Sequence, residues 1–343
     1  MKLFAISEVL AAIGVQYPEG RSQIVLPCPC CDKEGGRHLG LNLEKGLYNC
    51  PRCGVHGGII DLYGLYKGLD RDASIKELLK WREGAIPSPT PAAPAPKTNP
   101  TAPRQVRANT YGRLLLSLPL MEKHRKDLIR RGLREEELFR YRSVPKWGTE
   151  KDIAKKLLDL GCTLEGVPGF FKLQTGEWAF VRQKSGFFIP AMDSDGYIVG
   201  MQVRLDDVSE RKYRWLSSSG YEAGAPASAY CHVSGPVRSE MLLTEGVLKA
   251  DIITAFTERS CIAVPGVNAL TQTKETLEAL KPKGLRKIWV CYDMDMYSNP
   301  RVMEAYQKLL QILDDLELEH GLYKWDPAYK GLDDYLAAKH PRS

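Results

Sequence analysis

The chain has 343 residues, of which 43% are hydrophobic and 26% charged, a composition typical of globular proteins with room for two or three domains. No apolar run is long enough to span a bilayer and no export signal opens the chain, so we expect no membrane association and a cytoplasmic location. The net charge of +6 is too small to indicate nucleic-acid binding by itself. The distribution of charge along the chain is more informative than the total. Residues 85–239 carry a net positive charge and residues 240–343 a net negative charge.

Residues 1–84 form the first expected domain, a small unit with two cysteine pairs. Cys28 and Cys31 form one CxxC pair and Cys50 and Cys53 the other, with eighteen residues between the pairs. In a reducing compartment, paired cysteines hold metal more often than they form disulfides. Four thiolates brought together by a hairpin are the closed ligand set of a structural zinc site. We therefore predict one zinc ion in a zinc ribbon, a small β-sheet with helices.

Other side chains near this quartet are weaker candidates. Cys30 could compete as a ligand, but Cys28 and Cys31 match the spacing of the second pair. His38 and His56 are expected at the surface or in hydrogen bonds.

The run YNCPRCGVHGGIIDLY, together with the start Cys28-Pro29-Cys30-Cys31, resembles the zinc-binding domain of bacterial DnaG-type primases. That family usually has histidine at the fourth position, where this chain has Cys31, as in the four-cysteine variant of some phage primases. The resemblance implies a domain that recognises the initiation site on a single-stranded DNA template.

Residues 85–108 contain seven prolines and little that could be buried, so we expect an extended, flexible linker. Residues 109–239 are expected to form an α+β subdomain. Helices are predicted for YGRLLLSLPLMEKHRKDLIRRGL, EEELFRY and KDIAKKLLDLG, the last ending at a glycine. The segment GFFIPAMDSDGYIVGMQVRL predicts a β-hairpin that turns at Asp195-Gly196.

Residues 240–343 alternate between strand and helix patterns, which indicates an α/β domain with a parallel sheet covered on both faces. Glu245 falls at the end of one predicted strand, and Asp293 and Asp295 follow another. Residues i and i+2 of an extended segment point to the same side, so the two aspartates can share one site with Glu245. Mg²⁺ prefers such oxygen ligands and can present the phosphates of a nucleotide to an attacking hydroxyl.

The order of Glu-Gly after a strand, the strand CIAVPG and then a strand with DxD resembles the Toprim fold, a Rossmann-like parallel sheet shared by primases, topoisomerases and some nucleases. The resemblance implies a further acidic residue in KGLDDYL, which we assign to Asp333 with Asp334 as the alternative. Primases commonly carry an aspartate where this chain has Lys249, and Asp251 follows two residues later. We expect Lys249 to contact nucleotide or template.

The segment GYIVGMQVRLDDVSERKYRWLSSSG resembles the primase stretch in which a hairpin leads to an arginine and then a Lys-Tyr motif. Arg204, Lys212 and Tyr213 take those positions. Arg and Lys would hold phosphate groups and the tyrosine ring would stack or form a hydrogen bond beside them. HRKDLIRRGLREEELFRY resembles the primase helix pair around Arg-Gly-Leu, which implies a nucleotide-binding role for Arg125.

These resemblances cover residues 24–82 and roughly 110–336, and imply a DNA primase with two or more catalytic Mg²⁺ or Mn²⁺ ions. Its substrates would be ribonucleoside triphosphates and a single-stranded DNA template, with a replicative helicase as a further partner. Chromosomal primases continue into a helicase-binding domain beyond the acidic segment, so we expect a phage, plasmid or mobile-element form.

Two alternatives stay open. A Toprim-type nuclease would use the same carboxylates to cut DNA. A replication accessory protein would bind single strands through its zinc and basic surfaces without catalysis, although an unused acidic cluster would repel DNA.

Overall fold

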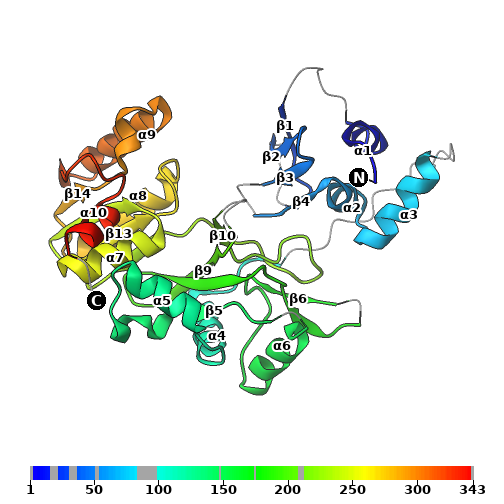
Figure 1. Cartoon of the computed structure of the whole chain (residues 1–343), viewed down its shortest axis with the longest axis horizontal. Coiled ribbons are helices and arrows are strands. Elements are labelled where there is room, and N and C mark those ends of the chain that lie inside the picture. The colour runs from blue at the N-terminus through cyan, green and yellow to red at the C-terminus, as the bar shows by residue number, and fades with distance from the viewer. Residues whose placement is uncertain are drawn as a thin grey trace. The chain divides into compact units, whose positions relative to one another are not determined.

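The chain folds into two units, each assembled from segments that are separated in sequence. Unit 1 comprises residues 1–102, 150–182 and 216–228, and unit 2 comprises residues 103–149, 183–215 and 229–343. The elements are labelled in the computed structural model of Figure 1. The structure describes residues 3–15, 22–30, 37–50, 54–82, 99–146, 148–173, 175–207 and 212–340.

Unit 1 begins with a small antiparallel sheet and three helices. Their bounds are α1 Ile6–Ala12, β1 Gln23–Pro27, β2 Arg37–Asn42, β3 Leu47–Asn49, β4 His56–Gly58, α2 Ile59–Lys67 and α3 Arg71–Arg82. The strands pair in the order β1-β2-β3-β4. Alternate residues of β1 are buried, so Ile24 and Leu26 face the core while Val25 is exposed. The small sheet with helices expected for this segment is confirmed.

Helix α2 is delimited by two glycines. The amide of Gly58 donates to Asp61 Oδ2 at 2.9 Å, which satisfies a free N–H at the start of the helix. Gly68 ends the helix in the left-handed conformation, at a φ of 69° that glycine adopts without strain. The sequence GGIID therefore starts the helix directly after β4.

The rest of unit 1 contains helix α6 (Glu150–Asp159) and the hairpin strands β6 (Phe170–Lys172) and β7 (Trp178–Phe180). Helix α6 packs against β7, with Ile153, Ala154 and Leu157 buried. The helix predicted to end at a glycine does so, and Gly161 has a φ of 76°.

Unit 2 begins with helices beside a second antiparallel sheet. The bounds are α4 Arg104–Leu116, α5 Glu122–Arg130, the 3₁₀ helix η1 Glu135–Arg140, β5 Arg142–Ser143, β8 Gly186–Met192, β9 Ile198–Leu205 and β10 Tyr213–Trp215. The sheet order is β10-β9-β8-β5. The predicted β8–β9 hairpin is confirmed, and Gly196 has the positive φ of 81° that its turn requires. EEELFRY forms a 3₁₀ helix and not an α-helix.

The end predicted for the proline-rich linker is wrong. Helix α4 starts at Arg104, directly after Pro103, and packs against β9, so residues 104–108 are helical. Pro103 precedes the helix without interrupting it, because a proline at this position removes no intrahelical hydrogen bond. The part of the linker at residues 85–98 lies outside the described residues. The predicted subdomain 109–239 is also shared between the two units.

The C-terminal part of unit 2 is a five-stranded sheet with helices. Its bounds are β11 His232–Ser234, β12 Glu240–Glu245, α7 Val247–Thr257, β13 Cys261–Val264, α8 Leu270–Leu280, β14 Lys287–Val290, the 3₁₀ helix η3 Met294–Tyr297, α9 Pro300–Asp315, β15 Glu319–Leu322 and α10 Leu332–Lys339. The order is β11-β13-β12-β14-β15. Strands β13, β12, β14 and β15 are parallel, and β11 is antiparallel at one edge.

Both faces of this sheet are buried. Met241 and Leu243 of β12 pack with Leu277 of α8 and Leu309 of α9 in one core. Leu242 lies in a separate core that also includes residues of α7 and α10. Because neighbouring side chains of a strand point to opposite faces, β12 is apolar along its whole buried length. The predicted parallel α/β sheet is confirmed. Among the helices of the described residues, none is both long enough and apolar enough to cross a bilayer.

Candidate active site

Three of the four predicted acidic residues follow elements of the parallel sheet at one edge. Glu245 is the last residue of β12, and Asp293 lies three residues beyond the end of β14. Strands β12 and β14 are parallel neighbours in which Leu243 faces Val290. Their carboxyl ends therefore meet, as expected for a ligand site in such a sheet.

Burial and charge both act on Glu245. Burial is the larger cause that raises its pKa, and the carboxylates of Asp293 and Asp295 raise it further. Lys249 and Lys330 act in the opposite direction. Since the charges of both aspartates act on Glu245, the three side chains form one electrostatic cluster.

Asp333 joins this cluster from the first turn of α10. Its side chain is buried, at 7% exposure, and no described residue donates a hydrogen bond to its Oδ1. Burial raises the pKa of Asp333, and Asp334 and Asp293 add to the effect. Asp334 is exposed on the same turn, so burial favours Asp333 as the member of the site.

Two lysines lie among the carboxylates. The Nζ of Lys249, in the first turn of α7, forms an ion pair with Asp293 Oδ1. The Nζ of Lys330 lies 3.0 Å from Asp295 Oδ2 and 3.8 Å from Asp293 Oδ2. The sequence assigned a role to Lys249 but missed Lys330, although Lys330 opens the segment KGLDDYL in which the acidic residue was sought.

The pKa of Lys249 reflects this environment. Burial lowers it, but Asp333, Asp293 and Glu245 together raise it above its usual value. The lysine is therefore charged and held between carboxylates. Asp251, two residues later on α7, lies elsewhere: it accepts hydrogen bonds from Tyr141, Ser234 and His232. Residues two apart on a helix lie about 200° apart around its axis, which separates the two side chains.

Basic residues lie beside the acidic ones. A pocket of about 240 Å³ is lined by Arg131, Lys212, Tyr213, Leu248, Lys249, Ile252, Asp293, Lys330, Asp333 and Asp334. Burial lowers the pKa of Lys212, and the charges of Arg131 and Arg204 lower it further. We call Arg131, Arg204 and Lys212 the basic cluster.

Arg204 does not line the pocket but lies opposite Tyr213, which does. It pairs with Tyr213 across β9 and β10, and its guanidinium lies 3.1 Å from Asp127 Oδ2. The same carboxylate oxygen accepts from Arg131 Nε at 3.1 Å. Arg204 is only 11% exposed in its side chain, and it is not among the residues that line the pocket.

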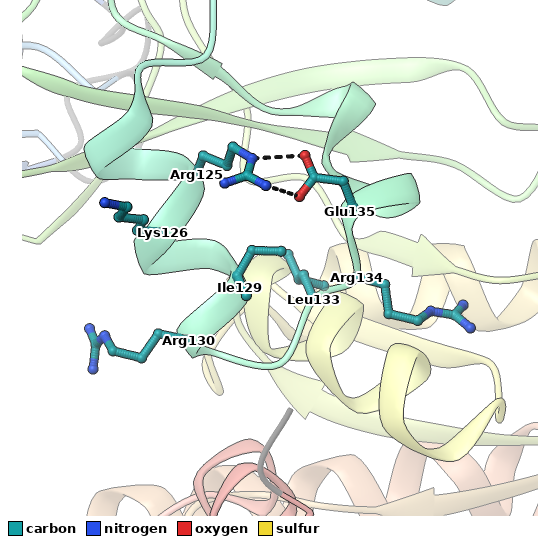
Figure 2. Close-up of a pocket in the computed structure, with 7 residues that line it drawn as sticks. All are labelled: Arg125, Lys126, Ile129, Arg130, Leu133, Arg134 and Glu135. Carbon is teal, nitrogen blue, oxygen red and sulfur yellow. Dashed lines mark hydrogen bonds and ion pairs between the residues drawn. The ribbon is translucent and has the colours of Figure 1, made fainter. Parts of the chain in front are cut away.

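Arg125 does not join the basic cluster. It lines a different pocket of about 690 Å³, with Lys126, Ile129, Arg130, Leu133, Arg134 and Glu135. Figure 2 shows its guanidinium directed at Glu135. Arg125 Nε lies 2.8 Å from Glu135 Oε1, and Nη2 lies 2.7 Å from Oε2. Arg131 lies six positions after Arg125, which places the two side chains about 120° apart around a helix axis. The structure thus puts Arg131, which the sequence analysis missed, where Arg125 was expected.

The predicted zinc ligands are only partly within the described residues. Cys28 and Cys50 are fully buried in one core and follow β1 and β3. Cys31 and Cys53 lie outside the described residues, so the four-cysteine site stays a prediction. The exposed ring of His56 lies with Nδ1 2.9 Å from the carbonyl oxygen of Gly54, in agreement with the hydrogen-bonding role expected.

The described carboxylates suit a divalent cation by chemistry but are not arranged around one point. No group of three or more His, Cys, Asp or Glu among the described residues is placed to hold a metal ion. The four carboxylates face two ammonium groups, and Asp333 Oδ1 is buried without a described donor. The four carboxylates therefore carry more negative charge than the two lysines neutralise. Carboxylate oxygens are hard ligands of the kind that Mg²⁺ prefers.

Comparisons with known proteins bear on the fold. Residues 236–343 match a family model described as a domain of unknown function, DUF3854. No curated protein matches the chain. The zinc-binding and RNA polymerase domains of the Aquifex aeolicus primase are 15% identical, with a TM-score of 0.52 over 98% of this chain and 80% of that one.

Two further structures are similar over a smaller share of the chain. A DNA primase domain from Pseudomonas aeruginosa has 16% identity and a TM-score of 0.47, over 68% of this chain and 75% of that one. The RNA polymerase domain of Mycobacterium tuberculosis primase, in complex with double-stranded DNA, has 17% identity and a TM-score of 0.48, over 65% and 74%. On the Aquifex match, this chain has the fold of the zinc-binding and RNA polymerase domains of a bacterial primase.

Proposed function

We propose that the chain is a DNA primase, which joins ribonucleoside triphosphates into a short RNA primer on a single-stranded DNA template. The observation that carries the proposal is the composition of one pocket. Arg131 and Lys212 line it together with Asp293 and Asp333. A polyanionic substrate needs the cations, and metal-assisted transfer of a nucleotidyl group needs the carboxylates.

The acidic residues would hold Mg²⁺ or Mn²⁺. Glu245, Asp293, Asp295 and Asp333 supply the oxygen ligands. A divalent ion held by these carboxylates would supply Lewis-acid stabilisation of the phosphate charge during nucleotidyl transfer.

The basic cluster would bind the substrates. Arg131 and Lys212 reach the pocket and would neutralise triphosphate or template phosphates. Tyr213, which also lines the pocket, would stack on a base or donate a hydrogen bond to it. Arg204, linked to Arg131 through Asp127, would fix the position of the cluster.

The N-terminal part would recognise the template. Four cysteines with one zinc ion would fix the turns that follow β1 and β3, and a stable ribbon would present its surface to single-stranded DNA. The proline-rich segment would tether this part to the catalytic unit.

Primer synthesis is the direct test. The full chain is incubated with single-stranded templates, Mg²⁺ or Mn²⁺ and labelled ribonucleotides, and short RNA products are expected. Cleavage of the template without such products would contradict the proposal in favour of a nuclease. Template binding with neither products nor cleavage would favour a non-catalytic accessory protein.

A further inference from the structure

Lys249 lies among the carboxylates of Glu245, Asp293, Asp295 and Asp333, which we call the acidic site. Its Nζ contacts Asp293 Oδ1, and the charges of Asp333, Asp293 and Glu245 all act on it. The three carboxylates lie at the end of β12, in the segment after β14 and in α10, so a single ammonium group on α7 interacts with three separate segments. Its side chain is 28% exposed, against 64% for Lys330.

Gly331 lies next to the charged groups of Asp333, Asp293 and Lys249. A Cβ atom at this residue would collide with Asp333 Oδ1 and would lie 3.3 Å from Asp293 Oδ1. It would also lie 3.4 Å from Lys249 Nζ. Two carboxylate oxygens and the ammonium therefore surround one small space beside the backbone, which a side chain at residue 331 would fill.

The position of Lys249 on its helix is unfavourable for a cation. Lys249 lies in the first turn of α7, which contains no acidic residue. The positive end of the helix dipole disfavours a cation there, and burial disfavours it too. The surrounding carboxylates must offset both effects, so the lysine and the acidic residues are mutually dependent. Asp333 Oδ1, buried and without a described donor, keeps one free position in the cluster.

We propose that Lys249 is a fixed cation of the acidic site, and that its ammonium group occupies the place of one divalent ion. The chain would then bind one fewer metal ion than its four carboxylates would otherwise hold. Lys330, which is exposed and lies before α10, would move aside when metal binds. The inference depends on the metal use proposed above, but it does not depend on primer synthesis.

Metal counting tests this inference. Zinc-loaded full chain is titrated with Mn²⁺, and the bound ions per chain are counted by electron paramagnetic resonance. Lys249→Met, which keeps the length of the side chain but removes its charge, is expected to bind one more Mn²⁺ than the unmodified chain. Lys249→Gln should also bind one more Mn²⁺, and it replaces the methionine variant if that variant does not fold. Lys249→Arg keeps the charge and should bind the same number of Mn²⁺ ions as the unmodified chain.

The matched control removes the charge of a lysine that also pairs with a carboxylate but lies outside the acidic site. Lys308 on α9 lies 2.7 Å from Glu304 and is 58% exposed, so Lys308→Met should leave the Mn²⁺ count unchanged. Equal counts and affinities for the unmodified chain and both neutral variants would overturn the inference, as would an extra ion in Lys249→Arg. Primer synthesis is assayed on the same samples. Its absence, with the extra ion present, would refute the primase proposal and leave the role of Lys249 standing.

Discussion

The hydroxyl of Tyr141 donates a hydrogen bond to Asp251 Oδ2 at 2.6 Å, and both side chains are buried. Tyr141 lies between η1 and β5 and Asp251 lies on α7, so the bond joins these two segments of unit 2. Arg140 lies 3.0 Å from Asp251 Oδ1. His232 accepts from the amide of Met192 through Nδ1, so its Nε2 carries the proton donated to Asp251. This network therefore buries one carboxylate among four donors, Tyr141, Arg140, His232 and Ser234.

Removal of the Tyr141 hydroxyl should destabilise unit 2. We expect Tyr141→Phe to lower the free energy of unfolding by about 1–3 kcal/mol, because it leaves a buried carboxylate with one donor fewer. Urea unfolding measures the change. Tyr297 is 61% exposed, so Tyr297→Phe is the control and should change stability by less than about 0.5 kcal/mol. Equal effects of the two variants would contradict the structural role of the network.

Asp251 should also make unit 2 acid-sensitive. Burial would raise its pKa, but His232 and Arg140 together with the Tyr141 hydrogen bond lower it to about 2, against about 3.9 in an unfolded chain. Its contribution, on the order of 2 kcal/mol, is complete above pH ~4 and is lost as the pH falls toward 2. Urea unfolding from pH 5 to 2 should show a steeper loss for the unmodified chain than for Asp251→Asn. Parallel curves would show that Asp251 does not contribute.

Asp293→Asn should abolish primer synthesis while template binding changes little, because the amide cannot supply the charge that a divalent ion needs. Labelled ribonucleotide incorporation and template binding are measured on the same sample. Asp315→Asn, at an exposed position on α9, is the matched control and should retain synthesis. Persistent synthesis in the Asp293 variant would place the metal ligands elsewhere.

Arg131 and Arg125 should differ in their effects. Arg131→Ala is expected to weaken nucleotide or template binding about tenfold, since a hydrogen bond to a charged group contributes at least about 1.5 kcal/mol. Arg125→Ala should change binding less than about twofold, because Arg125 lines a different pocket and pairs there with Glu122 and Glu135. Fluorescence anisotropy with labelled single-stranded DNA and titration with ribonucleotides measure both. The opposite ranking would show that substrate binds beside α5.

Cys50→Ser should remove zinc and unfold the N-terminal sheet, because structural zinc supplies much of the folding free energy of such small units. Zinc content and circular dichroism report this change, and template-specific initiation should be lost while the carboxylate unit stays folded. Cys30→Ser should retain zinc, since Cys30 is only half-buried and outside the predicted quartet. Zinc loss in the Cys30 variant would show that Cys30 and not Cys31 is the ligand.

Local sequence patterns were sufficient for much of the fold. Alternating apolar residues and the Asp195-Gly196 pair predict the β8–β9 hairpin, because strand direction and turn geometry depend on neighbouring residues. Apolar runs that end in Glu245 and just before Asp293 likewise predict parallel strands with carboxylates at their carboxyl ends. The end of the linker was predicted wrongly because Pro103, a linker residue by composition, is also compatible with a helix start.

Residue types and strand ends were readable without coordinates: the apolar runs that end at Glu245 and before Asp293, and the Lys212-Tyr213 motif, predicted which side chains could meet at the carboxyl ends of the parallel strands. Packing in three dimensions, by contrast, places Arg131 and not Arg125 in the pocket, and buries Asp333 while Asp334 stays exposed. It also brought Lys249 and Lys330 between the carboxylates. These outcomes depend on how α5, α7 and α10 rotate against their sheets. Helix rotation is set by packing between residues far apart in the chain, and no local pattern encodes it.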